Sequence, residues 1–233
     1  MAVGIHRNAR VLVDRAALYH NVHAEFQRLD RQTRLFMVVK ANGYGHGAVE
    51  VARIAKRAGA TGFCVAILDE ALELRYAGIN DPILVLGLTD PTNVPLAAKE
   101  KISLTVSTAS WLRRAAEILR SQSVNEPVRV HLALDTGMGR IGFQTAHGLK
   151  KALAVLNQNQ NYLNFEGIFT HFATADSPDD RYFKLQLTRF RRLMKVVRPR
   201  PRFVHVSNSA TSLWHQSCNG NLIRYGAAGY GLN

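Results

Sequence analysis

The sequence has 233 residues, of which 47% are hydrophobic and 20% charged, a composition typical of a globular protein with a full core. No apolar run approaches the roughly 20 residues that a membrane-spanning helix needs, and the N-terminal MAVGIHRNAR lacks the apolar segment of a secretory signal. Two cysteines, Cys64 and Cys218, are too few for a disulfide framework and lack metal-ligand spacing. We therefore expect a cytoplasmic protein without a metal or a membrane partner.

The formal net charge of +13 raises the question of nucleic-acid binding. The densest basic stretch runs from Arg189 to Arg202, where a helix is expected to end, and cations are favoured at that end of a helix. No nucleic-acid recognition motif accompanies this stretch. We therefore favour a solvated face, or a surface that matches an acidic domain outside this sequence, and expect no nucleic-acid partner.

Short apolar runs alternate with amphipathic segments along the whole chain. Eight runs have the β-branched and aromatic composition of strands covered on both faces. These predicted strands are Leu35–Val39, Gly62–Ala66, Ile83–Leu86, Ile102–Val106, Val128–Leu134, Phe165–Thr170, Phe203–Val206 and Leu222–Arg224. The predicted helices are Val13–Leu29, Gly47–Ala58, Leu68–Ala77, Asn93–Glu100, Thr108–Gln122, Ala146–Gln158 and Tyr182–Val196.

Eight strands with intervening helices predict an α/β fold that closes into a (β/α)8 TIM-type barrel. An open doubly wound sheet is the alternative. Residues 1–233 are expected to form one domain, because no internal repeat, low-complexity segment or linker interrupts them. In such a barrel the loops after the strands carry the chemistry.

Polar clusters follow five of the predicted strands and are expected to converge on one rim. These clusters are Lys40–Gly47, Asp135–Arg140, His171, Ser207–Ser209 and Arg224–Gly226. Lys40 ends an apolar run and opens a loop with three glycines, so its amine is placed to act as a nucleophile. A lone strand-end lysine more often only reaches solvent, and this loop is neither a Walker nor a Rossmann fingerprint. The combination of clusters favours a functional lysine.

Seven segments, in order along nearly the whole chain, resemble the motifs of alanine racemases. They are VVKANGYGHG, LDEALELR, PILVLG, DTGMGR, GIFTHFATAD, VHVSNSAT and IRYGAAGYGLN. The resemblance implies a fold-type III enzyme that uses pyridoxal 5′-phosphate to interconvert L-alanine and D-alanine. It also implies that this activity supplies D-alanine for cell-wall peptidoglycan, and that the full-length protein is a homodimer.

The resemblance also assigns the contacts of the cofactor phosphate. Tyr44 and Ser209 match side chains that bind the phosphate, and Gly226 and Ala227 match positions whose backbone N–H groups do so. Small residues suit this task, because the main chain can approach an anion closely. Asn208 is expected to fix the loop beside Ser209.

The cofactor ring is expected to lie between Lys40 and Arg224. By the resemblance, Lys40 forms the covalent Schiff-base link and serves as the base on one face of the substrate. Arg224 looks like the arginine that faces the pyridine nitrogen. Because arginine keeps its proton, that nitrogen stays unprotonated, which favours return of the proton to Cα over transamination. His171 resembles the histidine that orients this arginine; a purely structural role is equally compatible with a strand-end histidine.

Arg140 matches the arginine that contacts the phenolic oxygen of the cofactor and lies near the substrate carboxylate, as suits its fixed fork of donors. Many alanine racemases place a carbamylated lysine two residues before the aspartate of DTGMGR, whereas this chain has Ala133. A methyl group can neither carry the carbamate nor bond to Arg140. We therefore expect an anion such as chloride, or ordered water, to take that place.

The family's second base is a tyrosine of a C-terminal β domain, contributed by the other subunit, and no tyrosine here matches its motif. We therefore expect residues 1–233 to be the N-terminal barrel without that domain, as a fragment or as the barrel half of a longer gene product. Because a racemase needs a base on each face, we expect the barrel by itself to be weakly active or inactive. Two other functions stay open: a cofactor-storing pyridoxal-phosphate protein, whose sequence pattern is absent, and a broad-specificity amino-acid racemase, including membrane-linked serine racemases, which Ala133 slightly favours.

Overall fold

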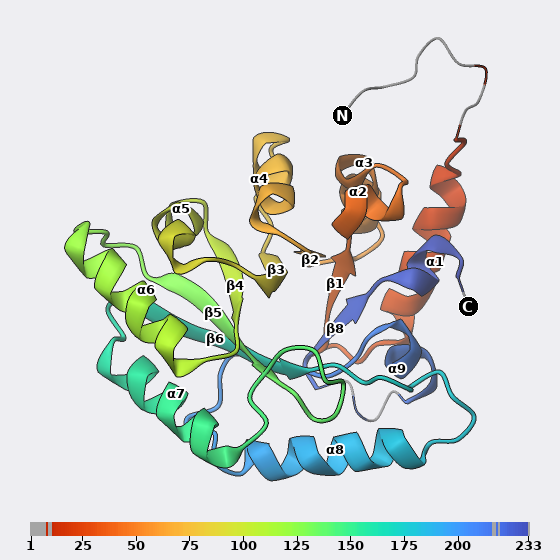
Figure 1. Cartoon of the computed structure of the whole chain (residues 1–233). Coiled ribbons are helices and arrows are strands. Elements are labelled where there is room, and N and C mark those ends of the chain that lie inside the picture. Colours follow the sequence, from red (N-terminus) through yellow and green to blue (C-terminus); the bar gives the residue numbers. More distant parts are fainter. Residues whose placement is uncertain (1–7, 9–10, 216–217, 219, 233) are drawn as a thin grey trace.

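The computed structural model describes residues 8, 11–215, 218 and 220–232, and its central feature is one sheet of eight parallel strands (Figure 1). Hydrogen-bonded neighbours follow the order β7-β6-β5-β4-β3-β2-β1-β8. The strands are β1 (Arg34–Val38), β2 (Gly62–Val65), β3 (Ile83–Leu88), β4 (Ile102–Val106), β5 (Val128–Leu134), β6 (Leu163–Thr170), β7 (Phe203–His205) and β8 (Leu222–Tyr225).

The two ends of this strand order meet and nearly close the sheet on itself. A parallel bridge pairs Ser207 with Ile223, and the N–H of Arg224 donates to the carbonyl of Ser207 at 3.0 Å. The Asn221 side chain adds two bonds across the seam, accepting from the N–H of Val204 and donating to the carbonyl of Arg202. The predicted (β/α)8 barrel is therefore confirmed, and the open doubly wound sheet is wrong.

Helices follow the strands and cover the outside of the barrel (Figure 1). They are α1 (Arg15–Arg28), α2 (Lys40–Tyr44), α3 (Ala48–Arg57), α4 (Leu68–Tyr76), α5 (Val94–Lys99), α6 (Ala109–Ser121), α7 (Ala146–Gln158), α8 (Arg181–Met194) and α9 (Ser209–Trp214), with 3-10 turns η1 (Pro91–Asn93) and η3 (Ala227–Tyr230). The seven helices expected from the sequence are present. The short elements α2 and α9 were not expected, and both lie in polar loops at the rim.

The two faces of the sheet differ in chemistry because side chains alternate along each strand. The outward face packs against the helices in one continuous apolar core, which includes Leu104, Leu112 and Leu132. The inward face is apolar beside β1, β2, β3 and the ends of β7 and β8, with Phe36, Cys64 and other residues in a second cluster. On the remaining strands the inward face carries buried polar side chains.

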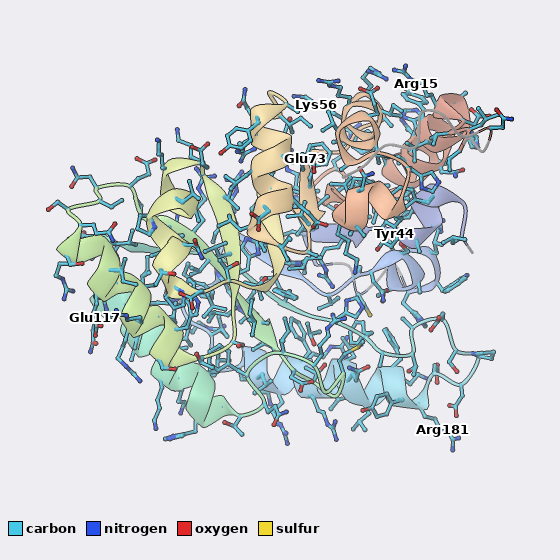
Figure 2. The ribbon with its side chains drawn as sticks, turned by 45° about the horizontal axis from the view of Figure 1, so that its top comes forward. Arg15, Tyr44, Lys56, Glu73, Glu117 and Arg181 are labelled. Atoms are coloured by element: carbon cyan, nitrogen blue, oxygen red, sulfur yellow. The ribbon has the colours of Figure 1, made fainter. Side chains whose placement is uncertain are left out.

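Charged side chains lie on the outer helices, as the labelled Arg15, Lys56, Glu117 and Arg181 illustrate (Figure 2). These residues form exposed ion pairs, which contribute little to stability each. The barrel is therefore stabilised mainly by its apolar layers.

Within the described ranges, none of the helices has both the length and the apolar character that crossing a membrane requires.

The loop after β5 depends on a glycine that admits no side chain. Gly142 has φ +131°, and an added Cβ would lie 2.4 Å from the backbone nitrogen of Asp135, whereas an added Cβ at Gly78, with φ +81°, meets nothing within 4 Å. We expect Gly78→Ala to lower the free energy of unfolding by about 1–2 kcal/mol through strain alone, and Gly142→Ala to lower it further, because the backbone must also move. Urea unfolding measures both. Equal losses would contradict the contact argument.

Candidate functional site

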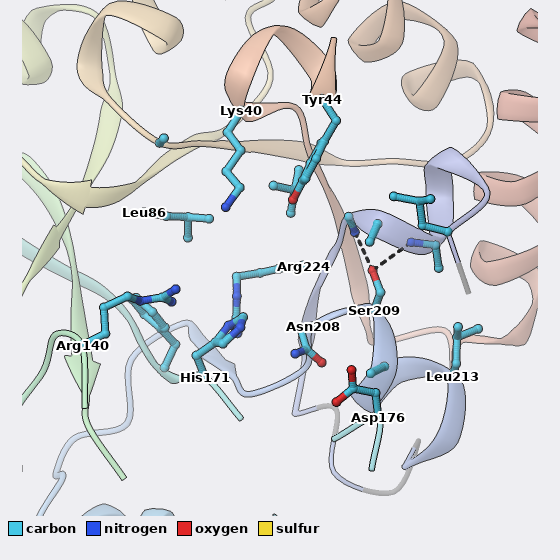
Figure 3. A pocket seen from close by; sticks show the side chains of 18 of the residues that line it. Lys40, Tyr44, Leu86, Arg140, His171, Asp176, Asn208, Ser209, Leu213 and Arg224 are labelled. Carbon is cyan, nitrogen blue, oxygen red and sulfur yellow. Dashed lines mark hydrogen bonds between the residues drawn. The ribbon is translucent and has the colours of Figure 1, made fainter. Parts of the chain in front are cut away.

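A cavity of about 540 Å³ opens at the rim formed by the C-terminal ends of the strands (Figure 3). This volume lies in the range of small-molecule sites. Its walls contain every residue that the sequence assigned to the site: Lys40, Tyr44, Arg140, His171, Asn208, Ser209, Arg224, Gly226 and Ala227. The predicted polar clusters therefore do converge on one place, as the barrel topology requires.

Lys40 directly follows β1, and the turn after it is unusual. Ala41, Asn42, Gly43 and Tyr44 all have left-handed backbone angles, with φ between 51° and 61°. Such consecutive residues are strained and persist only where neighbours hold them. Here the Glu70 carboxylate accepts from the N–H of Ala41 at 2.7 Å, and the side chain of Asn42 caps the next helix at the N–H of Ala48.

The left-handed turn has two consequences for the cavity. It directs the Lys40 amine into the cavity, toward Arg224 (Figure 3). It also places Tyr44 beside that amine, with the lysine Nζ 5.8 Å from the centre of the ring. Burial raises the pKa of Tyr44 above its usual value, so its hydroxyl keeps its proton and can donate a hydrogen bond.

Arg224 projects from β8 into the barrel and is 3% exposed. Its Nη1 donates to Nδ1 of His205 at 2.7 Å, and its Nη2 donates to the carbonyls of Thr170 and Val206. Burial lowers its pKa to about 10, which leaves the guanidinium charged at neutral pH. Among the described residues no hydrogen-bond partner reaches its Nε. This nitrogen is also not fully enclosed by protein atoms, so it is accessible from the cavity that Arg224 lines.

Two histidines flank this guanidinium. Nδ1 of His171 lies 3.5 Å from Nη2 of Arg224, at the outer limit of a hydrogen bond. Burial, followed by the charges of Arg224, Arg140 and Lys40, lowers the pKa of His171 to about 3. Burial and Arg224 likewise hold the pKa of His205 well below its usual value. Both imidazoles are therefore neutral at physiological pH and accept from the arginine.

A group of hydrogen-bond donors lies at the other end of the cavity. Ser209, the first residue of α9, accepts from the N–H groups of Gly226 at 2.9 Å and Ala228 at 3.4 Å. Ala227 begins η3, so its N–H has no acceptor within that turn. Asn208 caps α9 by accepting from the N–H and hydroxyl of Thr211. These contacts order the segment that carries the Ser209 hydroxyl.

Tyr44 reaches the same end of the cavity. A Cβ added at Gly226 would lie 3.3 Å from the Tyr44 hydroxyl, so that hydroxyl is close to the Gly226 backbone. The Tyr44 ring packs against Tyr230, whose own hydroxyl donates to the carbonyl of Val38 at 2.8 Å. A tyrosine hydroxyl, a serine hydroxyl and backbone amides therefore gather within one corner, which suits an anion.

Arg140 lines the opposite wall, in the loop that begins at Asp135. Burial by itself would raise the pKa of Asp135, but bonds from Gln144, Gly139 and Gly137 hold it below its usual value. The ionised Asp135 therefore organises this loop. Within the described chain no hydrogen bond or ion pair neutralises the Arg140 guanidinium. The expected anion or water near Ala133, which is 1% exposed, stays a prediction.

Some residues in or beside the cavity were not expected from the sequence. His205 lies within a predicted strand, where its apolar neighbours gave no sign that it receives the hydrogen bond of Arg224. Tyr230 lies in the IRYGAAGYGLN segment and closes the turn beside Tyr44. Leu86, Asp176 and Trp214 also line the cavity. All of them except Trp214 lie in the segments that resemble the family's motifs, but only spatial proximity assigns them to the site.

The fold and the site together define a parallel α/β barrel whose mouth contains a lysine amine, a buried arginine and a corner of hydrogen-bond donors that suits an anion. Comparison with known proteins makes this assignment specific. The chain belongs to the family described as alanine racemase, N-terminal domain, whose model matches residues 13–233.

Individual relatives agree with this family. The chain is 60% identical over 233 residues to an alanine racemase of Levilactobacillus brevis. This match covers all of this chain and 62% of that protein. It superimposes with a TM-score of 0.94 on a crystal structure of alanine racemase from E. faecalis, at 54% identity, again covering 62% of that chain. A histidine racemase from Leuconostoc mesenteroides is also similar, with a TM-score of 0.92 and 35% identity over 61% of its length.

The residues present fit pyridoxal phosphate, the cofactor that the family implies. The Lys40 amine can form the covalent link to an aldehyde, and the accessible Nε of Arg224 can donate to a ring nitrogen. The hydroxyls of Ser209 and Tyr44 and the N–H of Ala227 supply donors of the kind that hold a phosphate, whereas the N–H of Gly226 already donates to Ser209. Among the described residues no group of histidine, cysteine and carboxylate side chains is arranged to hold a metal.

The depressed pKa of His171 has a measurable effect on stability. Its folded value of about 3 lies below the unfolded value of 6.5, so the unfolded chain binds more protons between these pH values. The free energy of unfolding of the cofactor-free chain should therefore fall as pH falls from 7 to 5, with up to about 2 kcal/mol of the loss due to His171. His171→Gln should make the dependence shallower in urea titrations at both pH values; an unchanged slope would contradict a neutral His171.

Proposed function

We propose that this chain is the pyridoxal-phosphate-binding barrel of an amino-acid racemase that interconverts L-alanine and D-alanine. The observation that carries the proposal is the arrangement of Lys40 and Arg224, with amine and accessible Nε facing one cavity whose far corner suits a phosphate. The 60% identity to an alanine racemase supports the choice of substrate. In this proposal the product D-alanine serves peptidoglycan synthesis, in a cytoplasmic homodimer.

The proposed roles follow from the position of each side chain. When bound, pyridoxal phosphate supplies an electron-withdrawing ring that makes the substrate α-proton acidic. Lys40 accepts or returns that proton on the face of the ring that its amine approaches. Arg224 would donate from Nε to a ring nitrogen, which its positive charge would keep unprotonated. Ser209, Tyr44 and the N–H of Ala227 would hold the phosphate.

Arg140 has a different proposed role, because it reaches the cavity from the opposite wall. Its permanent positive charge stabilises an oxygen anion of the cofactor or the substrate carboxylate. The proton transfer on the other face needs a second base, and we propose that it comes from outside the described barrel. The chain spans 62% of the length of the L. brevis relative, which leaves room for that base in the complete protein.

Substrate breadth is the second part of the proposal to test. Similarity to a histidine racemase at 35% identity suggests that this barrel type is compatible with a larger side chain. Because identity to alanine racemases is much higher, we propose alanine as the main substrate. Turnover of L-alanine and L-histidine by the complete protein, each followed by chiral separation of the amino acids, compares the two. Faster turnover of histidine would contradict the proposed substrate.

Lys40→Ala should abolish both the visible absorbance of the lysine-bound cofactor and alanine racemisation, because no other described side chain of the cavity provides an amine. Lys56→Ala is the matched control, since Lys56 lies on α3, is exposed and pairs with Asp81. Spectra of cofactor-saturated protein and a coupled D-amino-acid oxidase assay give the two readouts. Visible absorbance that persists in Lys40→Ala would exclude this cofactor link.

Ser209→Ala tests the phosphate corner. Loss of a hydrogen bond to a charged group costs about 1.5–3 kcal/mol, so affinity for pyridoxal phosphate should fall about 10- to 100-fold. Affinity for pyridoxal, which lacks the phosphate, should change little. Ser110→Ala on the exposed start of α6 is the matched control. Equal losses for the two ligands, measured by fluorescence titration, would place the phosphate elsewhere.

A further inference from the structure

A continuous line of hydrogen bonds crosses the interior of the barrel beneath the cavity. It uses one buried side chain from each of β4, β5, β6, β7 and β8: Ser103, His131, Glu166, His205 and Arg224. The hydroxyl of Ser103 donates to Glu166 at 2.5 Å, and Nε2 of His131 lies 3.0 Å from the same carboxylate oxygen. Nδ1 of His131 lies 2.9 Å from Nε2 of His205, whose Nδ1 receives the Arg224 bond.

A strand irregularity builds the middle of this line. In the β5–β6 pair, Val130 lies opposite Phe165 but His131 lies opposite Gly167, so Glu166 is an extra residue. A bulge of this kind changes the direction of a side chain, and here both Glu166 and Gly167 adjoin His131. A Cβ at Gly167 would lie 2.3 Å from the His131 ring, so only glycine leaves room for the imidazole.

The donors and acceptors along the line can be arranged in only one direction. Arg224 only donates, so Nδ1 of His205 must accept and its proton must be on Nε2. That Nε2–H donates to Nδ1 of His131, which places the His131 proton on Nε2 as well. The His131 Nε2–H then donates to the carboxylate of Glu166. Both rings are neutral Nε2–H tautomers, and the ionised carboxylate fixes this choice.

We propose that Glu166 is a positioning residue for Arg224, acting through the tautomers of His131 and His205 to keep Nε of the arginine directed at the cavity. If His131 lacked its acceptor, its proton could move to Nδ1, and His205 would then place its proton on Nδ1. That N–H would meet the donor of Arg224, and two donors repel. The guanidinium would have to rotate, which changes the donor offered to a ring nitrogen.

Charge supports this role. Glu166 is 7% exposed, and burial by itself would raise its pKa, but its bonds from His131 and Ser103 hold the pKa below the usual value. The line therefore joins a buried anion to a buried cation through two neutral rings. The positive charge of Arg129 also acts on Glu166 and adds to the stabilisation of the carboxylate. A carboxylate with only a packing role would not have to be connected to Arg224 by hydrogen bonds through both histidines.

The first test measures the tautomers directly, without cofactor. Long-range ¹H–¹⁵N spectra of the histidine-labelled chain should show Nε2–H tautomers for both His131 and His205. Glu166→Gln keeps an amide oxygen for His131 and should preserve both tautomers. Glu166→Leu removes the acceptor and should move a substantial fraction of either ring to the Nδ1–H form. A wild-type Nδ1–H tautomer at His205 would overturn the proposal, even if Glu166→Leu fails to fold.

The second test rests on the proposed function and uses the complete, cofactor-loaded protein. Glu166→Leu should shift the visible absorbance maximum and lower kcat at least 10-fold with little change in KM, whereas Glu166→Gln should restore most of both. Ser103→Ala, which leaves the carboxylate and its bond to His131 in place, should resemble Glu166→Gln. If the tautomers change as expected but wild-type protein binds no cofactor, the proposed function fails and the positioning of Arg224 stands. Folded Glu166→Leu with unchanged tautomers and spectrum would overturn the positioning role.

Discussion

The site depends on keeping a charged guanidinium inside the barrel. Removing an isolated ion from water costs several kcal/mol, so a buried arginine must be surrounded by acceptors. Arg224 finds them in His205 and in the carbonyls of Thr170 and Val206, and these partners leave Nε accessible to the cavity. These acceptors come from β6, from β7 and from the residue that follows β7. The charged Arg224 can therefore be buried only because the barrel closes beside β8.

Positive charge is also a property of the cavity as a whole. Among the described residues Lys40, Arg140 and Arg224 line it together with one carboxylate, Asp176. In such an environment a histidine is disfavoured as a cation, which is why His171 remains neutral. An anionic ligand is favoured by the same field. The electrostatics of the cavity thus agree with a ligand that carries a phosphate and a phenolic oxygen.

The sequence predicted the barrel well because apolar residues recur in it with the patterns of buried strands and of amphipathic helices. Buried strands such as Ile102–Val106 and Val128–Leu134 are short apolar runs, and helices such as Ala146–Gln158 follow a separate period, so their bounds agree with the structure. The left-handed turn after Lys40 could not be predicted in this way. Only one of its four left-handed residues is glycine, and contacts from Glu70 and Asn42 stabilise it. Tertiary contacts, not local preference, determine that conformation.

The sequence predicted only part of the site. Side chains in rim loops, such as Lys40 and Ser209, belong to motifs that local sequence shows. His131, Glu166 and His205 lie within strands, separated by up to 74 positions, and only the bulge in β6 brings Glu166 to His131. No spacing rule connects residues on three neighbouring strands when one strand contains an extra residue.

A final constraint concerns water. A carbon deprotonated next to a cationic cavity is protected only if the cavity excludes solvent. The rim of this barrel instead exposes large apolar side chains, with Ile67 53%, Leu88 56% and Trp214 55% exposed, and Trp214 lines the cavity itself. Exposed apolar surface around a polar cavity is typical of a contact surface. In the proposed racemase, the element that brings the second base to the open face would therefore also cover this rim, so that one contact provides both the proton donor and the exclusion of water.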